Sequence, residues 1–170
     1  MQIGIFFCSY IMEIKIAIQG IQGSFHHQVA HRYFGEAIGL DECVTFRDLA
    51  NSLKNNLSDK AIMAIENSIA GAILPNYALI DSYDLHIIGE HFLDIHMNLM
   101  VFPGQTIEEI QEVHSHPIAL LQCANFFSQY PHIKLVESSD TAIAAKRIQE
   151  NQLKGIGALG GPVAAEIYNL

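Results

Sequence analysis

Hydrophobic residues recur along this chain with two spacings, one typical of strands and one typical of helices. Stretches that are almost wholly apolar or that alternate strictly predict strands, and apolar residues three or four positions apart predict helices. The expected strands are 13–18, 43–46, 60–65, 112–114, 133–137 and 155–159, and the expected helices are 25–34, 47–56, 74–81, 117–128, 140–151 and 162–168. Strands that take turns with helices indicate an α/β protein with mostly parallel sheets covered by helices.

The stretch 85–102 breaks this alternation. It is long, rich in β-forming residues and interrupted near Gly89 and Asp94. We expect it to supply two strands and a crossing between two lobes. Ligands of α/β proteins tend to bind at the carboxyl ends of the strands, so a cleft between two such lobes is the expected site.

The first dozen residues are expected to lie outside the folded domain. Residues 3–12 are apolar but too short to span a bilayer, and they lack the basic start and cleavage site of a signal peptide. Met12 directly precedes the first expected strand. We therefore expect Met12 to be the natural start and 1–11 to be an upstream extension, with 1–12 outside the folded domain as a non-native or disordered segment.

Composition excludes several classes of protein. Half of the 170 residues are hydrophobic and 16% are charged, which excludes intrinsic disorder. Nine basic against 18 acidic residues give a net charge of −9, which argues against nucleic acid or an anionic membrane as partner. The three cysteines, Cys8, Cys43 and Cys123, are odd in number and far apart. A disulfide framework is not expected, and a reduced cytoplasm fits best.

Four turns between a strand and a helix are rich in small and hydroxyl residues. In the first, GIQGSF at 20–25, Gly20 and Gly23 permit a tight turn and close approach of a ligand. Ser24 suits the N-cap, and amides at a helix start attract carboxylates or phosphates. The alternative is an ordinary turn without a ligand.

The second turn, ENSIAG at 66–71, directly follows an apolar strand. It places the carboxylate of Glu66, the amide of Asn67 and the hydroxyl of Ser68 in succession at a strand end. This is a typical place for a binding site, although a polar loop also serves solubility alone.

The third turn contains Ser115 and His116 before Pro117, a residue that suits the first position of a helix. Gln122 follows on the same expected helix. In the fourth turn, SSDTA at 138–142, Asp140 is the expected N-cap, and Ser139 and Thr141 could direct hydroxyls into a cleft. Taken singly, helix capping explains both segments.

The sequence gives little support for a metal site, a nucleotide site or a hydrolase site. His27 and His31 share one helix face, but no carboxylate or thiolate at a standard spacing joins them, so no metal is expected. The chain has no Walker loop, no nucleophile elbow and no dinucleotide fingerprint, although a triad assembled in space stays open.

Together and in this order, the four segments resemble the prephenate dehydratase family. The family's Gly-Pro-x-Gly-Thr/Ser-Phe-Ser-His-Gln turn is matched by GIQGSFHHQ at 20–28, and its Pro-Ile-Glu-Asn-Ser/Thr-x-x-Gly motif by AIENSIAG at 64–71. Its Ser-His-Pro with a following Gln-Cys is matched at 115–117 and 122–123. Its Ser-Thr-Ala helix start is represented by SDTA at 139–142, with an extra residue between the hydroxyls. The similarity runs from about residue 14 to residue 170.

The resemblance implies two α/β lobes with a central cleft, like a type 2 periplasmic-binding-protein fold. Lobe one would comprise 13–89 plus 154–170, and lobe two 90–153. It also implies the conversion of prephenate to phenylpyruvate in phenylalanine biosynthesis, in which a dicarboxylate loses its ring hydroxyl as water and one carboxylate as CO2. No cofactor or metal is implied, and relatives generally assemble as homodimers or homotetramers.

The resemblance also implies the site residues. Asn67, Ser68 and Gln122 would hydrogen-bond the substrate, and Glu66 would orient the loop or influence proton transfer. The substrate-binding set would comprise Gly20, Gly23, Ser24, Ser115, Ser139 and Thr141.

The departures from the family pattern affect the expected activity. Ile21 and Ala64 replace prolines, which removes stiffness but no reacting group. The family's Thr-Arg-Phe motif occurs nowhere in this sequence, and neither does its ACT domain. The family threonine is thought to act on the departing hydroxyl and the arginine to help hold a carboxylate. We therefore expect a truncated chain with an incomplete first lobe, which turns prephenate over very slowly or not at all.

Two alternatives remain at this point. A non-enzymatic module that binds small anions would share the lobes and the cleft. An arogenate dehydratase would share nearly all of the motifs.

Overall fold

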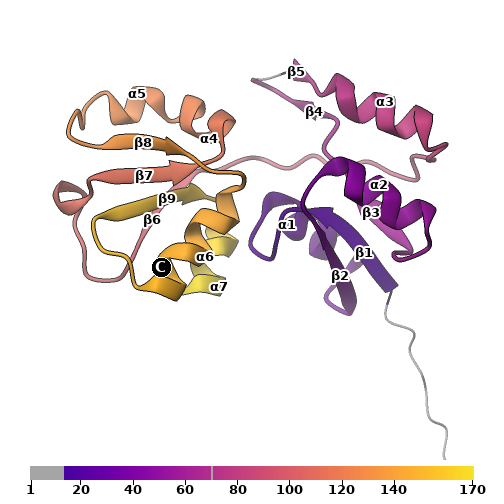
Figure 1. Cartoon of the computed structure of the whole chain (residues 1–170), viewed down its shortest axis with the longest axis horizontal. Coiled ribbons are helices and arrows are strands. Elements are labelled where there is room, and N and C mark those ends of the chain that lie inside the picture. Colours follow the sequence, from indigo (N-terminus) through magenta and orange to yellow (C-terminus); the bar gives the residue numbers. More distant parts are fainter. Residues whose placement is uncertain (1–13, 70) are drawn as a thin grey trace, which may run out of the picture.

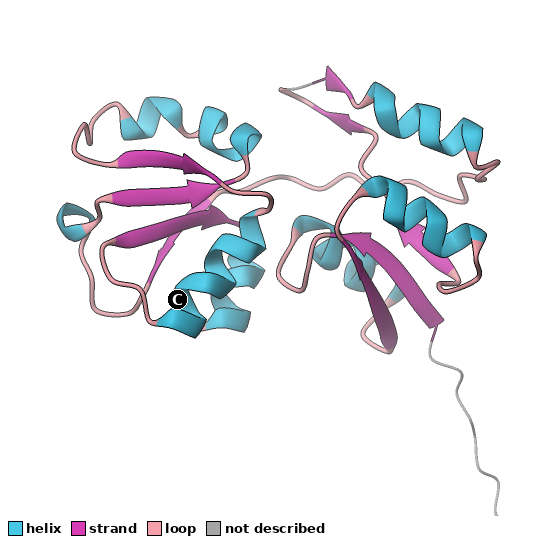
Figure 2. Ribbon diagram, in the orientation of Figure 1, coloured by secondary structure: helices cyan, strands magenta, loops and turns pink. Residues whose placement is uncertain are grey.

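The computed structural model describes residues 14–69 and 71–170. The expected extension at 1–12 and the first residue of the expected first strand lie outside the described residues. Two α/β lobes lie side by side and are joined by an extended connection (Figures 1 and 2). The predicted fold class is thus confirmed.

The first lobe is built on a parallel sheet in the order β2-β1-β3. Its strands are β1 (Ile14–Gln19), β2 (Ile38–Cys43) and β3 (Lys60–Ile62). Side chains alternate between the two faces of a strand. Ile16 and Ile18 therefore pack with Ala30 of α1 (Phe25–Phe34), whereas Ala17 packs with Leu49 of α2 (Phe46–Lys54) on the opposite face.

A polar cluster ties this lobe together at one edge of the sheet. Asp41 of β2 accepts hydrogen bonds from the hydroxyls of Ser52 on α2 and Ser58 before β3, the latter at 3.0 Å. Lys15 Nζ lies 3.4 Å from the other carboxylate oxygen. The hydrogen bond from Ser52, the largest influence, keeps the pKa of Asp41 below its usual value.

The sequence after β3 forms a small hairpin rather than the expected loop. β4 (Glu66–Asn67) and β5 (Gly71–Ala72) pair antiparallel and lead into α3 (Leu74–Ser82). The hairpin base is anchored by the bond from Ile73 N to Ile65 O, at 2.9 Å. The side-chain amide of Asn76, which is 2% exposed, donates to Ala64 O at 2.7 Å.

The second lobe contains a mixed sheet in the order β6-β9-β7-β8. β7 (Glu112–Ser115) lies parallel to β8 (Lys134–Glu137) and to β9 (Ile156–Gly160), and β6 (Asn98–Val101) lies antiparallel to β9. A short 3-10 helix, η1 (Ile107–Glu109), precedes β7.

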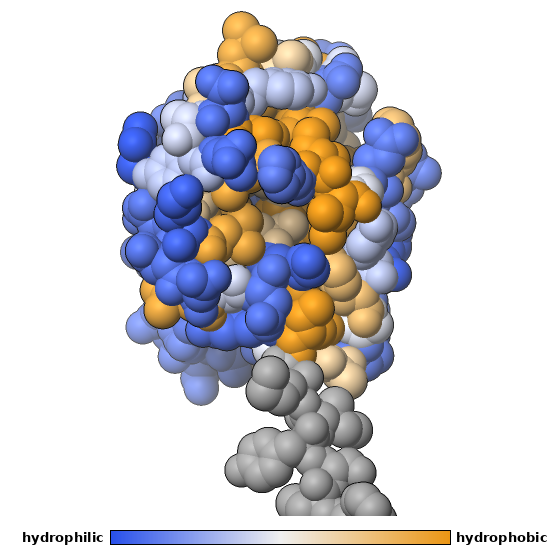
Figure 3. Space-filling view, turned by 90° about the vertical axis from the view of Figure 1, so that its right-hand side faces the viewer, coloured by the Kyte–Doolittle hydropathy of each residue, from blue (hydrophilic) through white to orange (hydrophobic). Residues whose placement is uncertain are grey.

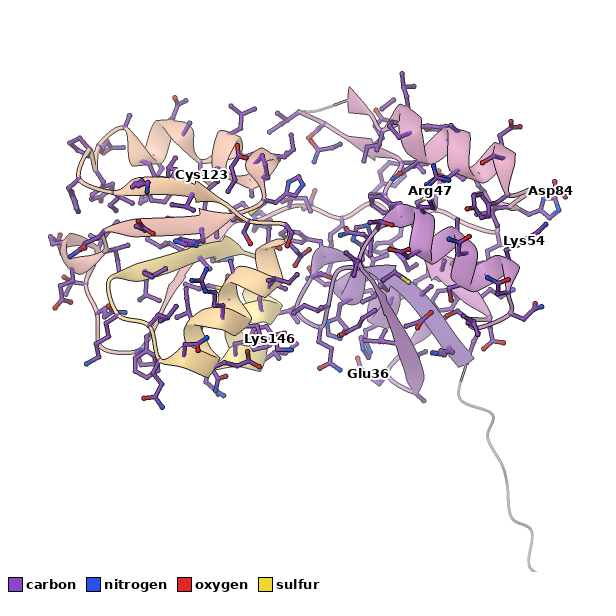
Figure 4. All side chains as sticks on the ribbon, in the orientation of Figure 1. Glu36, Arg47, Lys54, Asp84, Cys123 and Lys146 are labelled. Atoms are coloured by element: carbon purple, nitrogen blue, oxygen red, sulfur yellow. The ribbon has the colours of Figure 1, made fainter. Side chains whose placement is uncertain are left out.

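Helices cover both faces of this second sheet. Leu120 of α4 (Pro117–Gln122) and Phe127 of α5 (Ala124–Phe127) pack with Val113 on one face. Ala145 of α6 (Thr141–Asn151) and Ala164 of α7 (Pro162–Tyr168) pack on the other. Cys123, between α4 and α5, lies in the helical layer above the sheet (Figure 4).

The structure differs from the expected lobe boundaries at the C-terminal segment, 154–170. This segment belongs by its pairing to the second lobe, because β9 pairs with both β6 and β7. The absence of a side chain at Gly157 makes this pairing possible, because a Cβ there would lie 2.7 Å from Leu99 Cδ1 and 3.3 Å from Val113 Cγ2.

Three further expectations need correction. β2 starts at Ile38, several residues before the expected strand at 43–46. The expected helix 117–128 is two helices separated at Cys123, and the connection before β6 runs as extended chain without the second expected strand.

The outer face of the first lobe carries apolar side chains in a strip between polar surfaces (Figure 3). Exposed large hydrophobic residues of this lobe and the connection include Leu57, Leu74, Tyr77, Ile87 and Ile88. No helix within the described part of the chain has the length and apolar character needed to cross a membrane.

Candidate functional site

The parallel strands of the second sheet end on the side that faces the first lobe (Figures 1 and 2). Three helices start at these strand ends, with His116, Asp140 and Gly161 as the N-caps of α4, α6 and α7. In the first lobe, the turn 20–24 follows the carboxyl end of β1. Ligands of α/β proteins bind at the carboxyl ends of the strands, and these ends of the two lobes are therefore adjacent in this molecule.

Asp140 is the N-cap that its sequence position predicts. Its Oδ1 accepts hydrogen bonds from the backbone amides of Ala142 at 2.7 Å and Ile143 at 3.2 Å. Burial raises the pKa of this carboxyl group, against the opposing effects of these amides and His116. Its other oxygen faces the first lobe, because a Cβ on Gly20 would lie only 2.9 Å from Oδ2. The first and fourth predicted segments thus meet.

The amides of the turn 20–24 already have partners within the protein. Gly20 N donates to Cys43 O at 2.9 Å, Gln22 N to Glu42 Oε1 at 2.7 Å, Gly23 N to His27 Nδ1 at 3.1 Å and Ser24 N to Ile21 O at 3.0 Å. Ser24 caps α1 as expected, accepting from His27 N at 3.1 Å, and it is 2% exposed. This turn is a packed structural element and does not offer these four amides to an anion.

Helix α7 packs on the same turn. A Cβ on Gly23 would lie 3.1 Å from Ala164 Cα and 3.2 Å from Tyr168 Cε2. The hydroxyl of Tyr168 donates to Gln22 O at 2.7 Å. Burial, followed by the acidic neighbours Glu42, Asp140 and Glu150, raises the pKa of Tyr168 to about 12. Helix α7 therefore joins the second lobe to the turn 20–24.

The predicted catalytic residues of the first lobe lie on the β4–β5 hairpin. Glu66 and Ser68 are exposed, and Asn67 is half-buried. Asn67 Oδ1 accepts from Ile69 N at 2.9 Å, which shapes the turn between the two strands. The carboxylate and the hydroxyl at this hairpin are accessible to a ligand.

The predicted residues of the second lobe differ in accessibility. Ser115 is fully buried, and its hydroxyl donates to Leu159 O at 2.8 Å, which ties β7 to β9. Thr141, 7% exposed, packs against Gly160 of β9, and Ser139 is exposed beside it. Gln122 is half-buried at the end of α4. Ser115 therefore has a structural role in this state.

The structure brings only part of the predicted site together. The turn 20–24 meets the segment 139–141, whereas the hairpin lies over the first lobe and α4 over the second (Figure 1). One hollow of about 480 Å³ is lined by Gln22, His31, Ile38, Leu40 and Glu42. Another, of about 580 Å³, lies between β6 and α7. Neither is lined by Asn67, Gln122 or Thr141.

The histidines of α1 form a cluster of their own. The rings of His27 and His31 stand edge to face with centroids 4.6 Å apart, and His31 Nδ1 lies 3.2 Å from a carboxylate oxygen of Glu36. Burial lowers the pKa of His26 to about 4, and its Nε2 is buried without a hydrogen-bond partner. Over residues 14–69 and 71–170, no three His, Cys, Asp or Glu side chains are grouped to hold a metal ion.

The contacts of Gln22, Phe25, Gly161 and Tyr168 between the lobes were not predicted. A Cβ on Gly161 would lie 2.9 Å from Phe25 Cε1, so this contact is as tight as that at Gly23. The clustered glycines of the first turn were a usable signal, because glycine also marks places where two backbones approach closely. In the sequence alone they indicate a tight turn and the close approach of a ligand.

The chain is similar to enzymes of aromatic amino-acid metabolism. It is 31% identical over 170 residues to a bifunctional chorismate mutase/prephenate dehydratase of Buchnera aphidicola, with 96% of this chain and 44% of the relative covered. It is 36% identical over 157 residues to arogenate dehydratase 2 of Petunia hybrida, with 92% and 39% covered. The chain thus spans less than half the length of these relatives.

A solved structure and a family description agree with these similarities. The crystal structure of prephenate dehydratase from Arthrobacter aurescens in complex with L-Phe superposes with a TM-score of 0.81 at 24% identity, covering 91% of this chain and 52% of that one. At this identity the likeness shows the fold alone. The model of the family described as prephenate dehydratase matches residues 16–170. Because that match takes in both lobes and all four motif segments, the chain belongs to the prephenate dehydratase family.

Proposed function

We propose that this chain binds prephenate and supplies the substrate site for its decarboxylating dehydration to phenylpyruvate, a step of phenylalanine biosynthesis. The observation that carries the proposal is the contact of the first and fourth motif segments at the strand ends, where Gly20 meets Asp140. Family membership supports the assignment of the reaction.

The reaction needs a donor for the departing ring hydroxyl and a site that holds two carboxylates. Within the proposal, Asn67 and Ser68 hydrogen-bond the substrate from the hairpin, with Glu66 orienting them. Gln122, Ser139 and Thr141 act from the second lobe.

Gly20, Gly23 and Ser24 shape the site through packing, because their amides are engaged elsewhere. We leave Ser115 out of the substrate contacts, since its hydroxyl is buried and bonded to Leu159 O. The proposal therefore depends on uncharged side chains more than on backbone amides.

Calorimetric titration of the 170-residue chain with prephenate tests the site. Asn67→Ala and Gln122→Ala should each weaken binding roughly 10-fold or more, because each removes a hydrogen bond to a charged or strongly polar group. Gln129→Ala, at an exposed glutamine of the second lobe, is the matched control and should bind like the parent chain. No binding by the parent, or equal affinity in all variants, would refute the proposal.

Arogenate is the second candidate substrate, because the relative from Petunia hybrida is named an arogenate dehydratase. Titration and turnover with both compounds distinguish the two. Tight binding of either compound without product, also in a protein that carries the Thr-Arg-Phe motif, would favour a module that only binds anions.

We also propose that the protein is a cytoplasmic enzyme and that it assembles as a homodimer or homotetramer. Cys43 and Cys123 are free thiols in different lobes, which suits a reducing compartment. Sedimentation equilibrium would measure the oligomeric state, and a monomer at all concentrations would remove that part of the proposal.

A further inference from the structure

The lobes touch where the turn 20–24 meets the starts of α6 and α7 and the side chain of Tyr168. The hydrogen bond from Tyr168 Oη to Gln22 O, at 2.7 Å, joins residues 146 positions apart. It links the last helix of the second lobe to the first turn of the first lobe.

Packing around this bond leaves little room for movement. Gly23 and Ala164 are both buried, and a Cβ on Gly23 would lie 3.1 Å from Ala164 Cα, which is backbone and cannot easily give way. Phe25 of α1 packs equally closely on Gly161. The backbone of Gly23 thus lies against that of Ala164, and the backbone of Gly161 lies against the ring of Phe25, at separations that favour glycine.

The turn itself is rigid, so a shift of α7 would be passed on to the first lobe. Gly23 N donates to His27 Nδ1 on α1, and Gly20 N donates to Cys43 O at the end of β2. The turn is thereby fixed to a helix and a neighbouring strand of its own lobe.

The two sides of the predicted site extend away from this contact. Asn67 lies on the hairpin of the first lobe, and Gln122 lies on α4 of the second. Figure 1 shows the hairpin and α4 on the same side of the two sheets, each above its own lobe. A small rotation about the turn 20–24 changes the separation of these two elements.

We propose that Tyr168 is a positioning residue, which holds the two lobes at a fixed pivot through Gln22 and Gly23 so that the hairpin and α4 can close on one substrate. The identity of that substrate rests on the function proposed above. The pivot itself does not, because it stands on contacts within the protein.

The ionisation state of Tyr168 suits this role. Its hydroxyl must keep its proton to donate to Gln22 O, and a pKa of about 12 keeps it protonated at any physiological pH. Burial is the largest cause of this raised pKa, followed by the acidic groups that face the hydroxyl, Glu42, Asp140 and Glu150.

Tyr168→Phe removes the hydroxyl and keeps the ring. In ligand-free protein, amide hydrogen exchange in the turn 20–24 should accelerate roughly 2- to 10-fold, as expected for loss of one hydrogen bond, while exchange in β9 stays unchanged. The dissociation constant for prephenate should rise by a similar factor. Tyr83→Phe is the matched control, since it removes a bond from Tyr83 Oη to Asn51 Oδ1, at 2.9 Å, within the first lobe. It should change neither quantity.

A second pair of variants tests the packing. Gly23→Ala should separate the lobes and weaken binding more than Tyr168→Phe does. Gly35→Ala has a similar positive φ, 87° against 90°, with no atom within 4 Å of the new Cβ, and it should leave binding unchanged.

The outcomes separate the two proposals. Unchanged exchange and affinity in Tyr168→Phe, with normal binding by Gly23→Ala, would overturn the pivot. Accelerated exchange in a chain whose parent does not bind prephenate would support the pivot and overturn the proposed function.

Discussion

Gly20 lies so close to Asp140 that no side chain fits between the first turn of one lobe and the first helical residues of the other. A Cβ on Gly20 would be 2.9 Å from Asp140 Oδ2, and its φ of 96° is one that other residues rarely adopt. Two separate penalties therefore act on any substitution of this glycine.

Gly20→Ala should destabilise the protein by roughly 1–3 kcal/mol more than Gly35→Ala, because overpacking adds to the backbone strain that both variants share. Urea unfolding followed by circular dichroism measures the difference. Equal destabilisation of the two variants would show that Asp140 moves aside at no cost.

Asp140→Ala should lower the free energy of unfolding by about 1 kcal/mol, because α6 loses the cap that serves Ala142 N and Ile143 N. Asp140→Ser should recover most of this loss, since serine caps helices nearly as well. A serine variant as unstable as the alanine variant would indicate that the charge, rather than the cap, stabilises this helix.

Protonation of His26 should make stability depend on pH between about 6.5 and 4. Its pKa is lowered from 6.5 to about 4 on folding, so the unfolded chain binds a proton in this window that the folded chain does not. The contribution of His26 to stability is therefore largest above pH 6.5 and falls as the pH drops, by on the order of 3 kcal/mol in all.

Comparison of the free energy of unfolding at several pH values with that of His26→Gln isolates this contribution. The slope between pH 6.5 and 4 should become shallower in the variant. His86→Gln, at an exposed histidine of the connection, should keep the slope of the parent. An unchanged slope in His26→Gln would contradict the assignment.

The polar cluster at Asp41 should govern the response to stronger acid. Its pKa is lowered on folding, so its stabilising contribution is present above about 3.8 and is lost as the pH falls through the lower, folded value. Ser52→Ala removes the largest cause of the shift and should move the acid-unfolding midpoint to higher pH. Ser128→Ala, at an exposed serine of the other lobe, should leave the midpoint in place.

Helix ends were predictable where a local signal marks them. α1 starts after Ser24, which caps it, and α7 starts at Pro162; both helices have the predicted bounds. The predicted strand at 43–46 starts later than β2 does, because Asp41, a residue type that is rare in strands, lies within β2. Its carboxylate is stabilised there by two serine hydroxyls from elsewhere in the chain, which no local pattern reveals.

The motif segments were predictable as a set, but their spatial grouping was not. The sequence places Ser115 and Ser139 at strand ends alike, yet Ser115 is buried and bonded to Leu159 O of the neighbouring β9, and Ser139 is exposed. Which strand of the second sheet β9 joins depends on pairing between distant segments, and its five residues carry no local mark of their partners.

The hydrogen bond between Tyr168 and Gln22 also bears on the order in which the protein is made and folded. Its partners are separated by 146 residues, so the contact cannot form before the whole stretch from the turn 20–24 to α7 has been synthesised. During synthesis the β1–β2–β3 sheet of the first lobe is complete in sequence about a hundred residues before α7 is made, so this sheet can form first. A ribosome-bound chain that lacks α7 should therefore hold two lobes that meet at Gly20 and Asp140 but lack the contacts of Ala164 and Tyr168 with the turn 20–24.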